Sequence, residues 1–197
     1  MVNVFIDGKE GTTGLQIFER LGKRNDVSIV TLPEELRKDP AARKECINGA
    51  DIVFLCLPDA AARESVSLCE NERVRILDAS TAYRTNPAWA YGFPELSKEH
   101  RRRIAEGKRV AVPGCHASGF ISLVYPLIAG GIIAPDYPLV CHSVTGYSGG
   151  GKKMIAEYES EGRSIALDSP RQYALGQAHK HLPEMQAVCG LTYAPSF

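Results

Sequence analysis

The sequence predicts an α/β fold built on an open parallel sheet. Apolar runs of strand length alternate with helical patterns at the spacing of strand–helix–strand units. One run, Asp51–Leu57, is almost continuously apolar, which is typical of a parallel strand buried on both faces. A glycine-rich turn, Gly8–Gly14, directly follows the first strand-like run and leads into a helical pattern. Ligands of such sheets bind beyond the carboxyl ends of the strands, so we expect functional residues to gather there.

Strands and helices are expected to alternate as far as Val112. The expected strands are Val2–Asp7, Val27–Leu32, Asp51–Leu57, Val74–Asp78 and Arg109–Val112. The expected helices are Leu15–Leu21, Ala41–Asn48, Ala60–Cys69 and the charged, solvent-facing Lys98–Gly107. The proline-containing stretch Trp89–Leu96 is expected to be a loop.

The turn Gly8–Gly14 has the features of a phosphate-binding turn. Its glycines allow a tight bend and close approach of the backbone, and the N-terminus of the next helix attracts an anion. The spacing is GxxGxxG rather than GxGxxG, so a capped turn without a ligand is the alternative. No acid ends the second strand, whereas Arg37 and Lys38 follow closely, which favours the 2′-phosphate of NADP over the 2′-hydroxyl of NAD. A surface helix rich in basic residues would give the same pattern.

The stretch Val112–Gly119 is the one most suited to hold a nucleophile. A strand meets Pro113-Gly114 and then Cys115, and the apolar run Phe120–Tyr125 predicts a buried helix. A thiol at the start of a helix lies at the positive end of the dipole, among N–H groups without intrahelical partners, which favours the reactive thiolate. The alternative is a small buried core residue, as most free cysteines are.

Charge and hydropathy limit the classes of partner. Lys and Arg number 23 and Asp and Glu number 23, so the net charge is +0. This balance argues against a surface that binds nucleic acid over the whole protein, although it leaves room for a local basic patch. Apolar runs such as Phe120–Tyr125 are too short to span a bilayer. The N-terminus begins with a strand-like run and has no signal segment, so we expect a cytoplasmic protein.

The cysteine pattern predicts neither disulfides nor a metal site. No CxxC pair occurs, and the spacing fits no zinc site or disulfide framework. We therefore expect a reducing compartment, no bound metal, and five of the six cysteines as plain core residues. The six are Cys46, Cys56, Cys69, Cys115, Cys141 and Cys189.

A second glycine-rich stretch lies in the last third of the chain. Leu139–Thr145 is strand-like and leads to Gly146–Lys153, after which a helix is expected from Met154. Glycines followed by lysines at a helix start can cradle an anionic substrate. A flexible linker is the alternative.

Two histidines form the second chemical cluster. His179 and His181 would share a face on a strand, and Pro183 would stop its continuation. They lack a nearby third residue to complete a metal site, so they are either structural or one of them acts as a general acid/base with Cys115.

Taken together and in order, seven motifs resemble the N-acetyl-gamma-glutamyl-phosphate reductase family, in particular its shorter type. The resemblance runs from the first strand to the end of the chain, and the series is more specific than any single motif. The motifs are Gly8–Gly14, Cys56-Leu57-Pro58, Asp78-Ala79-Ser80 with Arg84, Gly92–Leu96, Pro113-Gly114-Cys115, Gly146–Lys152 and His179–Glu184.

The resemblance implies an NADPH-dependent reduction of an acyl phosphate to N-acetyl-L-glutamate 5-semialdehyde and phosphate, in arginine biosynthesis. It implies Cys115 as the nucleophile that forms a thioester and His181, or else His179, as the proton donor. The implied cofactor residues are Gly8, Gly11, Thr12, Thr13, Gly14, Pro58 and Ser80. Arg84, Ser148 and Lys152, with the second histidine, are the implied substrate residues.

The resemblance also implies two domains and a homo-oligomer. Residues 1–114 would form a Rossmann-like NADP-binding domain, and residues 115–197 would form part of an α+β catalytic domain. Members of the family continue beyond Phe197, so the resemblance implies that the chain lacks their C-terminal part, either as a fragment or as a truncated reading frame. The alternatives are an aspartate-semialdehyde-dehydrogenase-like reductase, an N-acetylated aminoadipyl substrate, a non-catalytic dinucleotide-binding module and, more remotely, a cysteine hydrolase.

Overall fold

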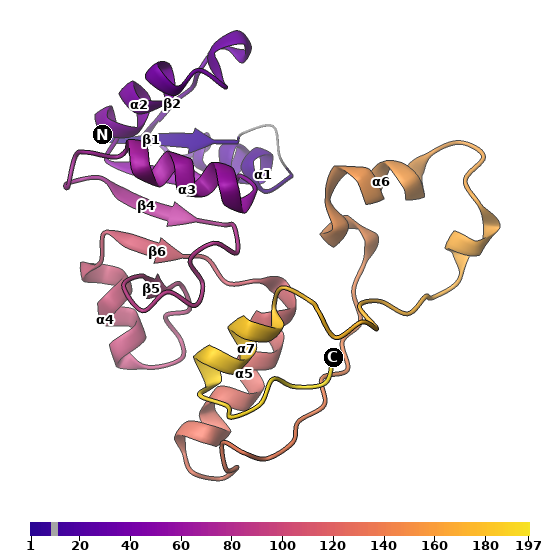
Figure 1. Cartoon of the computed structure of the whole chain (residues 1–197). Helices are drawn as coiled ribbons and strands as arrows, with labels where there is room; N and C mark the ends of the chain where they lie inside the picture. Colours follow the sequence, from indigo (N-terminus) through magenta and orange to yellow (C-terminus); the bar gives the residue numbers. More distant parts are fainter. Residues whose placement is uncertain (9–11) are drawn as a thin grey trace.

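In the computed structural model, which describes residues 1–8 and 12–197, six parallel strands form one sheet in the order β2-β1-β3-β4-β6-β5 (Figure 1). The strands are β1 Val2–Asp7, β2 Val27–Val30, β3 Ile52–Leu55, β4 Arg75–Asp78, β5 Ala90–Tyr91 and β6 Arg109–Ala111. The five strands expected from the sequence are all present, and the predicted α/β class is confirmed.

The helices of the first half follow the strands as the sequence predicts, and side chains cap the starts of α2 and α4. The carboxylate of Asp39 accepts from the backbone N–H of Ala42, and the hydroxyl of Ser97 accepts from that of His100. The helices are α1 Thr12–Leu21, α2 Pro40–Gly49, α3 Asp59–Leu68, α4 Lys98–Glu106, α5 Cys115–Ala129, α6 Gly151–Glu159 and α7 Leu182–Cys189, with 3₁₀ turns η1 Glu34–Leu36, η2 Tyr147–Gly150 and η3 Ile165–Asp168.

The strand order reverses at β1, which pairs with β2 on one side and with β3 on the other. Right-handed crossovers that run in opposite directions place their helices on opposite faces of a sheet. Helices α2 and α3 therefore share a face and pack on each other, and α1 covers the opposite face (Figure 1). The crevice at this reversal, outside the carboxyl ends of β1 and β3, is where such sheets bind ligands.

A buried ion pair fixes the end of β1. The carboxylate of Asp7 accepts from the guanidinium of Arg43 on α2 at 3.0 Å and from the hydroxyl of Ser65 on α3 at 2.8 Å. Asp7 and Arg43 are each 5% exposed. This network holds both helices against the strand that ends immediately before Gly8.

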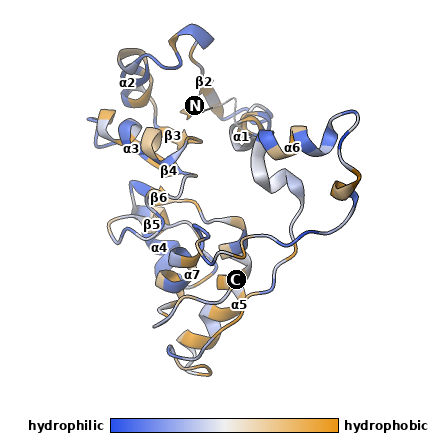
Figure 2. Cartoon of the chain, turned by 45° about the vertical axis from the view of Figure 1, so that its right-hand side comes forward, coloured by the Kyte–Doolittle hydropathy of each residue, from blue (hydrophilic) through white to orange (hydrophobic). Residues whose placement is uncertain are grey.

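Two apolar clusters form the core. One lies between the sheet and α2–α3 and contains Phe5, Val53 and Ile76. The other joins α5 to α7 and includes Ile121 and Met185, together with Tyr91 from the edge strand β5. Figure 2 shows α5 largely in the hydrophobic colour and the exposed helix α4 largely in the hydrophilic one.

Two expectations for the chain from Trp89 onward are wrong, and a third, for the histidine segment, is described below. The stretch Trp89–Leu96 is not all loop, because Ala90 and Tyr91 pair with β6. Leu139–Thr145 is not a strand; its only pairing among the described residues is a single bridge from Val140 to Ser196. A lone strand cannot satisfy its backbone groups without a neighbour, and Val140 is 81% exposed.

The histidine segment is not a strand either. His181 has right-handed helical backbone angles at the N-cap of α7, and Pro183 lies in the first turn of that helix instead of ending an element. Proline is tolerated there because a first-turn residue has no intrahelical partner for its N–H.

The segment 139–178 extends away from the rest of the fold and carries α6, whereas α5 and α7 lie side by side beneath the sheet edge (Figure 1). Helix α6 begins at Gly151, three residues before the expected Met154. Within residues 1–8 and 12–197, no helix combines the length and apolar character needed to cross a bilayer.

Candidate active site

The thiol of Cys115 is exposed at the first residue of α5. Strand β6 ends at Ala111, Val112 still donates its N–H to Asp78 O, and Gly114 is the N-cap of the helix. Gly114 has no side chain with which to cap the first turn, so the N-terminus of α5 is open to an anion. The position agrees with the sequence expectation for a reactive cysteine.

The other cysteines differ from Cys115 in burial. Burial, and then the carboxylates of Asp7 and Asp78, raise the pKa of Cys56 to about 11, and burial raises that of Cys189 to about 12. Cys189 alone is fully buried, whereas Cys46, Cys56, Cys69 and Cys141 are partly buried. All six thiols are free, but the expectation of five plain core cysteines is met fully by Cys189 only.

The two predicted histidines lie together, with ring centroids 4.6 Å apart. The backbone N–H of His181 donates to Nδ1 of His179 at 3.2 Å, so neutral His179 carries its proton on Nε2. That nitrogen lies 3.0 Å from the hydroxyl of Tyr173. His116, next to Cys115, is 5.6 Å and 5.9 Å from the two rings, respectively.

His181 is the buried member of this group, with 4% exposure. Burial first, and then the positive charges of His179 and Arg84, lower its pKa to about 3, so its imidazole is neutral at neutral pH. Its Nδ1 is buried without a hydrogen-bond partner in the described residues. Its Nε2 lies 2.3 Å from the point where a Cβ on Gly114 would stand, so the ring reaches the residue before Cys115. No group of three or more candidate ligands among the described residues is arranged to hold a metal.

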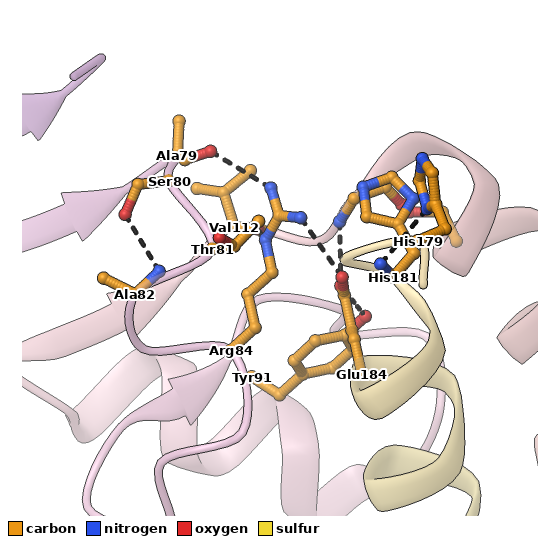
Figure 3. A network of polar contacts seen from close by, with 12 residues as sticks. Ala79, Ser80, Thr81, Ala82, Arg84, Tyr91, Val112, His179, His181 and Glu184 are labelled. Atoms are coloured by element: carbon orange, nitrogen blue, oxygen red, sulfur yellow. Dashed lines mark hydrogen bonds and ion pairs between the residues drawn. The ribbon is translucent and has the colours of Figure 1, made fainter. Parts of the chain in front are cut away.

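Glu184 ties the parts of the site together, and its side chain is 1% exposed (Figure 3). One carboxylate oxygen accepts from the Gly114 N–H at 2.8 Å and from the hydroxyl of Tyr91 at 2.7 Å. The other accepts from Nη1 of Arg84 at 3.1 Å. A single acid on α7 thus connects the start of α5, the edge strand and the loop after β4.

Arg84 was expected to bind substrate, but its donors face the protein. Besides Glu184, its Nε donates to Val112 O at 2.9 Å and its Nη2 to Ala79 O at 3.0 Å (Figure 3). The side chain is 8% exposed. These contacts make it part of the scaffold around Cys115.

A cleft of about 1710 Å³ brings together the candidate catalytic and substrate residues and one of the candidate cofactor residues. It extends from α1 and the end of β3, past the start of α5, to the segment that carries α6. Thr13 lines it on the cofactor side, and Ser148 and Lys152 line it on the opposite side. Cys115, Arg84, His179 and His181 also line this cleft.

The glycine turn after β1 is built for close backbone approach at Gly8. Its φ is +87°, and an added Cβ would lie 2.4 Å from Cys56 O, so only glycine fits. Gly14 is buried in α1. Gly11 lies outside the described residues, and of Thr12 only the backbone at the start of α1 is described.

Two further predicted cofactor residues are chain neighbours of residues that line the cleft. Pro58 is exposed at the N-cap position of α3, where it makes no side-chain hydrogen bond, and Cys56 and Leu57 before it line the cleft. The Ser80 hydroxyl is buried; it donates to Asp78 at 2.7 Å and accepts from the Ala82 N–H. Ser80 therefore shapes its loop from within.

Comparison with known proteins matches both halves of the chain. Residues 19–104 match the model described as semialdehyde dehydrogenase, NAD binding domain. Residues 115–196 match the one described as semialdehyde dehydrogenase, dimerisation domain. The two matches lie in the same order as the two parts of the fold, the sheet and the segment that begins with α5.

Curated relatives similar to this chain are named N-acetyl-gamma-glutamyl-phosphate reductase. One from Chelativorans sp. is 52% identical over 192 residues, and one from Burkholderia ambifaria is 52% identical over 195. Each alignment covers 98% of this chain and 61% of the relative, so the chain spans about three fifths of their length. The resemblance drawn from the motifs is confirmed.

A solved semialdehyde dehydrogenase shares the fold at low identity. Aspartate semialdehyde dehydrogenase from Francisella tularensis superposes with a TM-score of 0.64 at 12% identity, covering 99% of this chain and 70% of that chain. At this identity the match supports the fold alone.

Sequence reasoning missed the roles of Glu184 and Tyr91. Glu184 lay inside the histidine motif, but nothing in the motif indicated that its carboxylate would reach Gly114. Tyr91 lay in a stretch expected to be loop. The helical start at Leu182 was the available signal, because Glu184 then falls in the first turn and faces the same side as His181.

Proposed function

We propose that this chain carries the cofactor-binding and catalytic parts of an N-acetyl-gamma-glutamyl-phosphate reductase. The reaction is the NADPH-dependent reduction of N-acetyl-L-glutamyl 5-phosphate to the 5-semialdehyde and phosphate, a step of arginine biosynthesis. The observation that carries the proposal is the exposed Cys115 at a helix start, in one cleft with His179, His181 and Thr13 of the cofactor turn.

The cofactor half fits a dinucleotide. Gly8 lets the end of β1 pass close to the backbone of Cys56 after β3, and α1 begins directly after the turn, so its N-terminus can attract a phosphate. Gly8, Gly11, Thr12, Thr13 and Gly14 would hold the phosphates, and the loops after β3 and β4, with Pro58 and Ser80, would border the nicotinamide end. The cofactor, when bound, supplies the hydride.

The residues of the chain account for the other steps. The Cys115 thiolate attacks the acyl carbon, phosphate leaves, and a thioester remains on the sulfur. His181 would relay a proton from the solvent to the carbonyl oxygen as hydride adds at the carbon. The resulting thiohemiacetal would then release the semialdehyde as its C–S bond breaks and the hydroxyl proton returns to the sulfur. His181 is preferred to His179 because its ring reaches Gly114. Free N–H groups at the start of α5 can stabilise the oxyanion.

The charge of the cleft suits a substrate with a carboxylate and an acyl phosphate. Arg84, Lys152, Arg171 and Lys180 line it, and Asp168 is the one acid among its described lining residues. Arg84 and Arg171 are in ion pairs with Glu184 and Glu157. We assign the anions to Lys152, with the nearby hydroxyl of Ser148, and assign Arg84 to the scaffold.

The assembly and location belong to the same proposal. We divide the chain at Gly114, where β6 has ended and α5 begins, into a cofactor domain of residues 1–114 and a catalytic part of residues 115–197. The match of residues 115–196 to a dimerisation domain supports a homo-oligomer. The biosynthetic role favours the cytoplasm.

The decisive assay is reduction of NADP⁺ by N-acetylglutamate semialdehyde, measured with and without phosphate. It is run on this chain and on a chain extended to the length of its relatives. We expect phosphate-dependent turnover from the extended chain, and none with aspartate semialdehyde. N-acetyl-aminoadipate semialdehyde tests the longer substrate. NADPH binding without turnover in both chains would leave only a binding module.

Cys115→Ser tests the covalent route in the same assay. We expect at least a thousandfold loss of turnover because an alcohol cannot replace the thiolate as nucleophile. NADPH affinity, measured by fluorescence titration, should stay within about twofold because the cofactor turn is untouched. Ordinary turnover by this variant would rule out a thioester.

A further inference from the structure

The buried ion pair of Arg84 and Glu184 meets at the residue that precedes Cys115. Glu184 accepts the N–H of Gly114 at 2.8 Å, and a Cβ on Gly114 would lie 2.6 Å from Nη1 of Arg84. Both charged groups are therefore one residue from the sulfur-bearing residue. Their side chains are 1% and 8% exposed, so water screens them poorly.

The two charges act on Cys115 in opposite directions. A carboxylate next to the first turn of α5 repels a thiolate and competes for the positive end of the helix dipole. A guanidinium in the same place attracts a thiolate. Because the two opposite charges are paired, Glu184 and Arg84 together place no net charge next to the sulfur of Cys115.

We propose that Glu184 and Arg84 are paired positioning residues: Glu184 fixes the Gly114 turn, and Arg84 cancels the charge that this fixing brings next to Cys115. The inference rests on the proposed function only in taking Cys115 as the nucleophile. It explains why Arg84 directs its donors inward although it lines the cleft.

Other ionisable groups surround the pair, and none of them duplicates either partner. Tyr91 contacts Glu184 from β5 through a neutral hydroxyl, and burial raises its pKa, so it stays protonated. His181 is neutral at neutral pH. The other ionisable neighbours include Asp78 at the end of β4, whose carboxylate is buried and interacts electrostatically with Arg84. They also include His116 on α5, and His179 and Lys180 before α7. All of these residues are unchanged in the variants below.

Two substitutions separate the charges. In Glu184→Gln the amide oxygen can still accept from Gly114 and Tyr91, whereas the amide nitrogen takes the place of the oxygen that accepts from Arg84. The turn keeps its two hydrogen bonds while the negative charge and the contact with Arg84 are lost. Arg84→Met removes the positive charge and keeps a similar volume. The probe is iodoacetamide alkylation of Cys115, located by peptide mass, which needs neither substrate nor turnover.

The rate at about pH 7 is divided by the rate at about pH 10, where thiols are largely ionised, so that changes in access cancel. We expect this ratio to rise about fivefold to tenfold in Glu184→Gln and to fall by a similar factor in Arg84→Met. The double variant should return to within about twofold of the parent.

Three controls address the integrity of the fold. Tyr91→Phe removes one hydrogen bond to Glu184 without altering charge, so it should lower the melting temperature and leave the ratio unchanged. Glu99→Gln makes the same chemical change on exposed α4, where Glu99 pairs with Arg102, and should change neither. Arg84→Lys keeps the charge and should retain most of the parental ratio.

The proposal is supported if the alkylation ratio rises in Glu184→Gln, falls in Arg84→Met and returns to near the parental value in the double variant. Changes of the same sign, no change in either, or no recovery would overturn it, because a loosened turn affects both variants alike. Failure of both this chain and the extended chain in the NADP⁺ assay, with the opposite changes of the alkylation ratio intact, would overturn the enzyme assignment and leave the charge pairing standing.

Discussion

The sheet that ends at β6 and the segment 139–178 are stabilised in different ways. In the sheet, each strand except those at the edges has two neighbours, and Val53 and Ile76 are fully buried. In the segment, Val140 and Val144 are 81% and 90% exposed, and α6 contains no buried residue. The first region is held by its own core, whereas the second presents apolar side chains that this chain does not cover. Substitutions should therefore be costly in the first and cheap in the second.

The largest effect is expected from Arg43→Met, at the buried ion pair below the cofactor turn. It leaves the carboxylate of Asp7 without its charged partner, which typically costs about 3–5 kcal/mol of unfolding free energy. Urea denaturation followed by circular dichroism measures it. Arg24→Met breaks the exposed pair with Asp26 and should leave the midpoint unchanged. Equal effects at the two sites would contradict a rigid core in this half.

Gly8→Ala should come next. Its φ of +87° strains any other residue, and the new Cβ would meet the backbone of Cys56 at 2.4 Å. We expect a loss of about 1–3 kcal/mol and weaker NADPH binding. Gly49→Ala is the matched control, because a Cβ there meets nothing within 4 Å. Gly49 is the last residue of α2, and alanine has a higher helix propensity than glycine. A Gly8→Ala protein with parental stability would show that the turn is free to rearrange.

The sheet was predictable because each of its strands carries its own signal. The apolar run Ile52–Leu55 indicates a strand by itself, and in the sheet Val53 and Leu55 are buried while Ile52 and Phe54 are partly buried, so local pattern and tertiary position agree. Leu139–Thr145 has a similar pattern but lacks a partner strand, and a strand exists only through pairing. The short strand β5 was missed for the opposite reason. Two residues, Ala90 and Tyr91, are too few to show a periodic pattern, and they form a strand only because they pair with β6.

The candidate site divides in the same way. Cys115 was predictable, since a helix start after a strand and a Pro-Gly turn is a local feature. The contact of Glu184 with Gly114 spans 70 residues and depends on how α7 packs on α5. The inward course of Arg84 likewise depends on Glu184, 100 residues away. Residue type and spacing do not encode such distances, so the sequence indicated the reactive groups but not their supports.

His181 should make stability depend on pH. Its pKa falls from 6.5 to about 3 in the folded chain, mainly through burial, so between these values the unfolded chain binds a proton that the folded chain excludes. The free energy of unfolding should therefore fall as pH drops through this window, by about 1–2 kcal/mol between about pH 7 and about pH 5. Urea titrations at both pH values compare the parent with His181→Asn. A parental slope in the variant would assign the effect to other groups.

The smallest effect is expected at Val144, in the exposed segment. Val144→Ser removes an apolar side chain that is 90% exposed, so nothing is lost from the core and the free energy of unfolding should change by less than about 0.5 kcal/mol. The matched change at the centre of the sheet, Val53→Ala at 0% exposure, should cost about 2 kcal/mol because it leaves a cavity. If Val144→Ser proves as destabilising as Val53→Ala, then Val144 is covered in solution, either by a second copy of the chain or by its own segment folding back. Sedimentation at two concentrations distinguishes these, since only a second copy makes the effect depend on concentration.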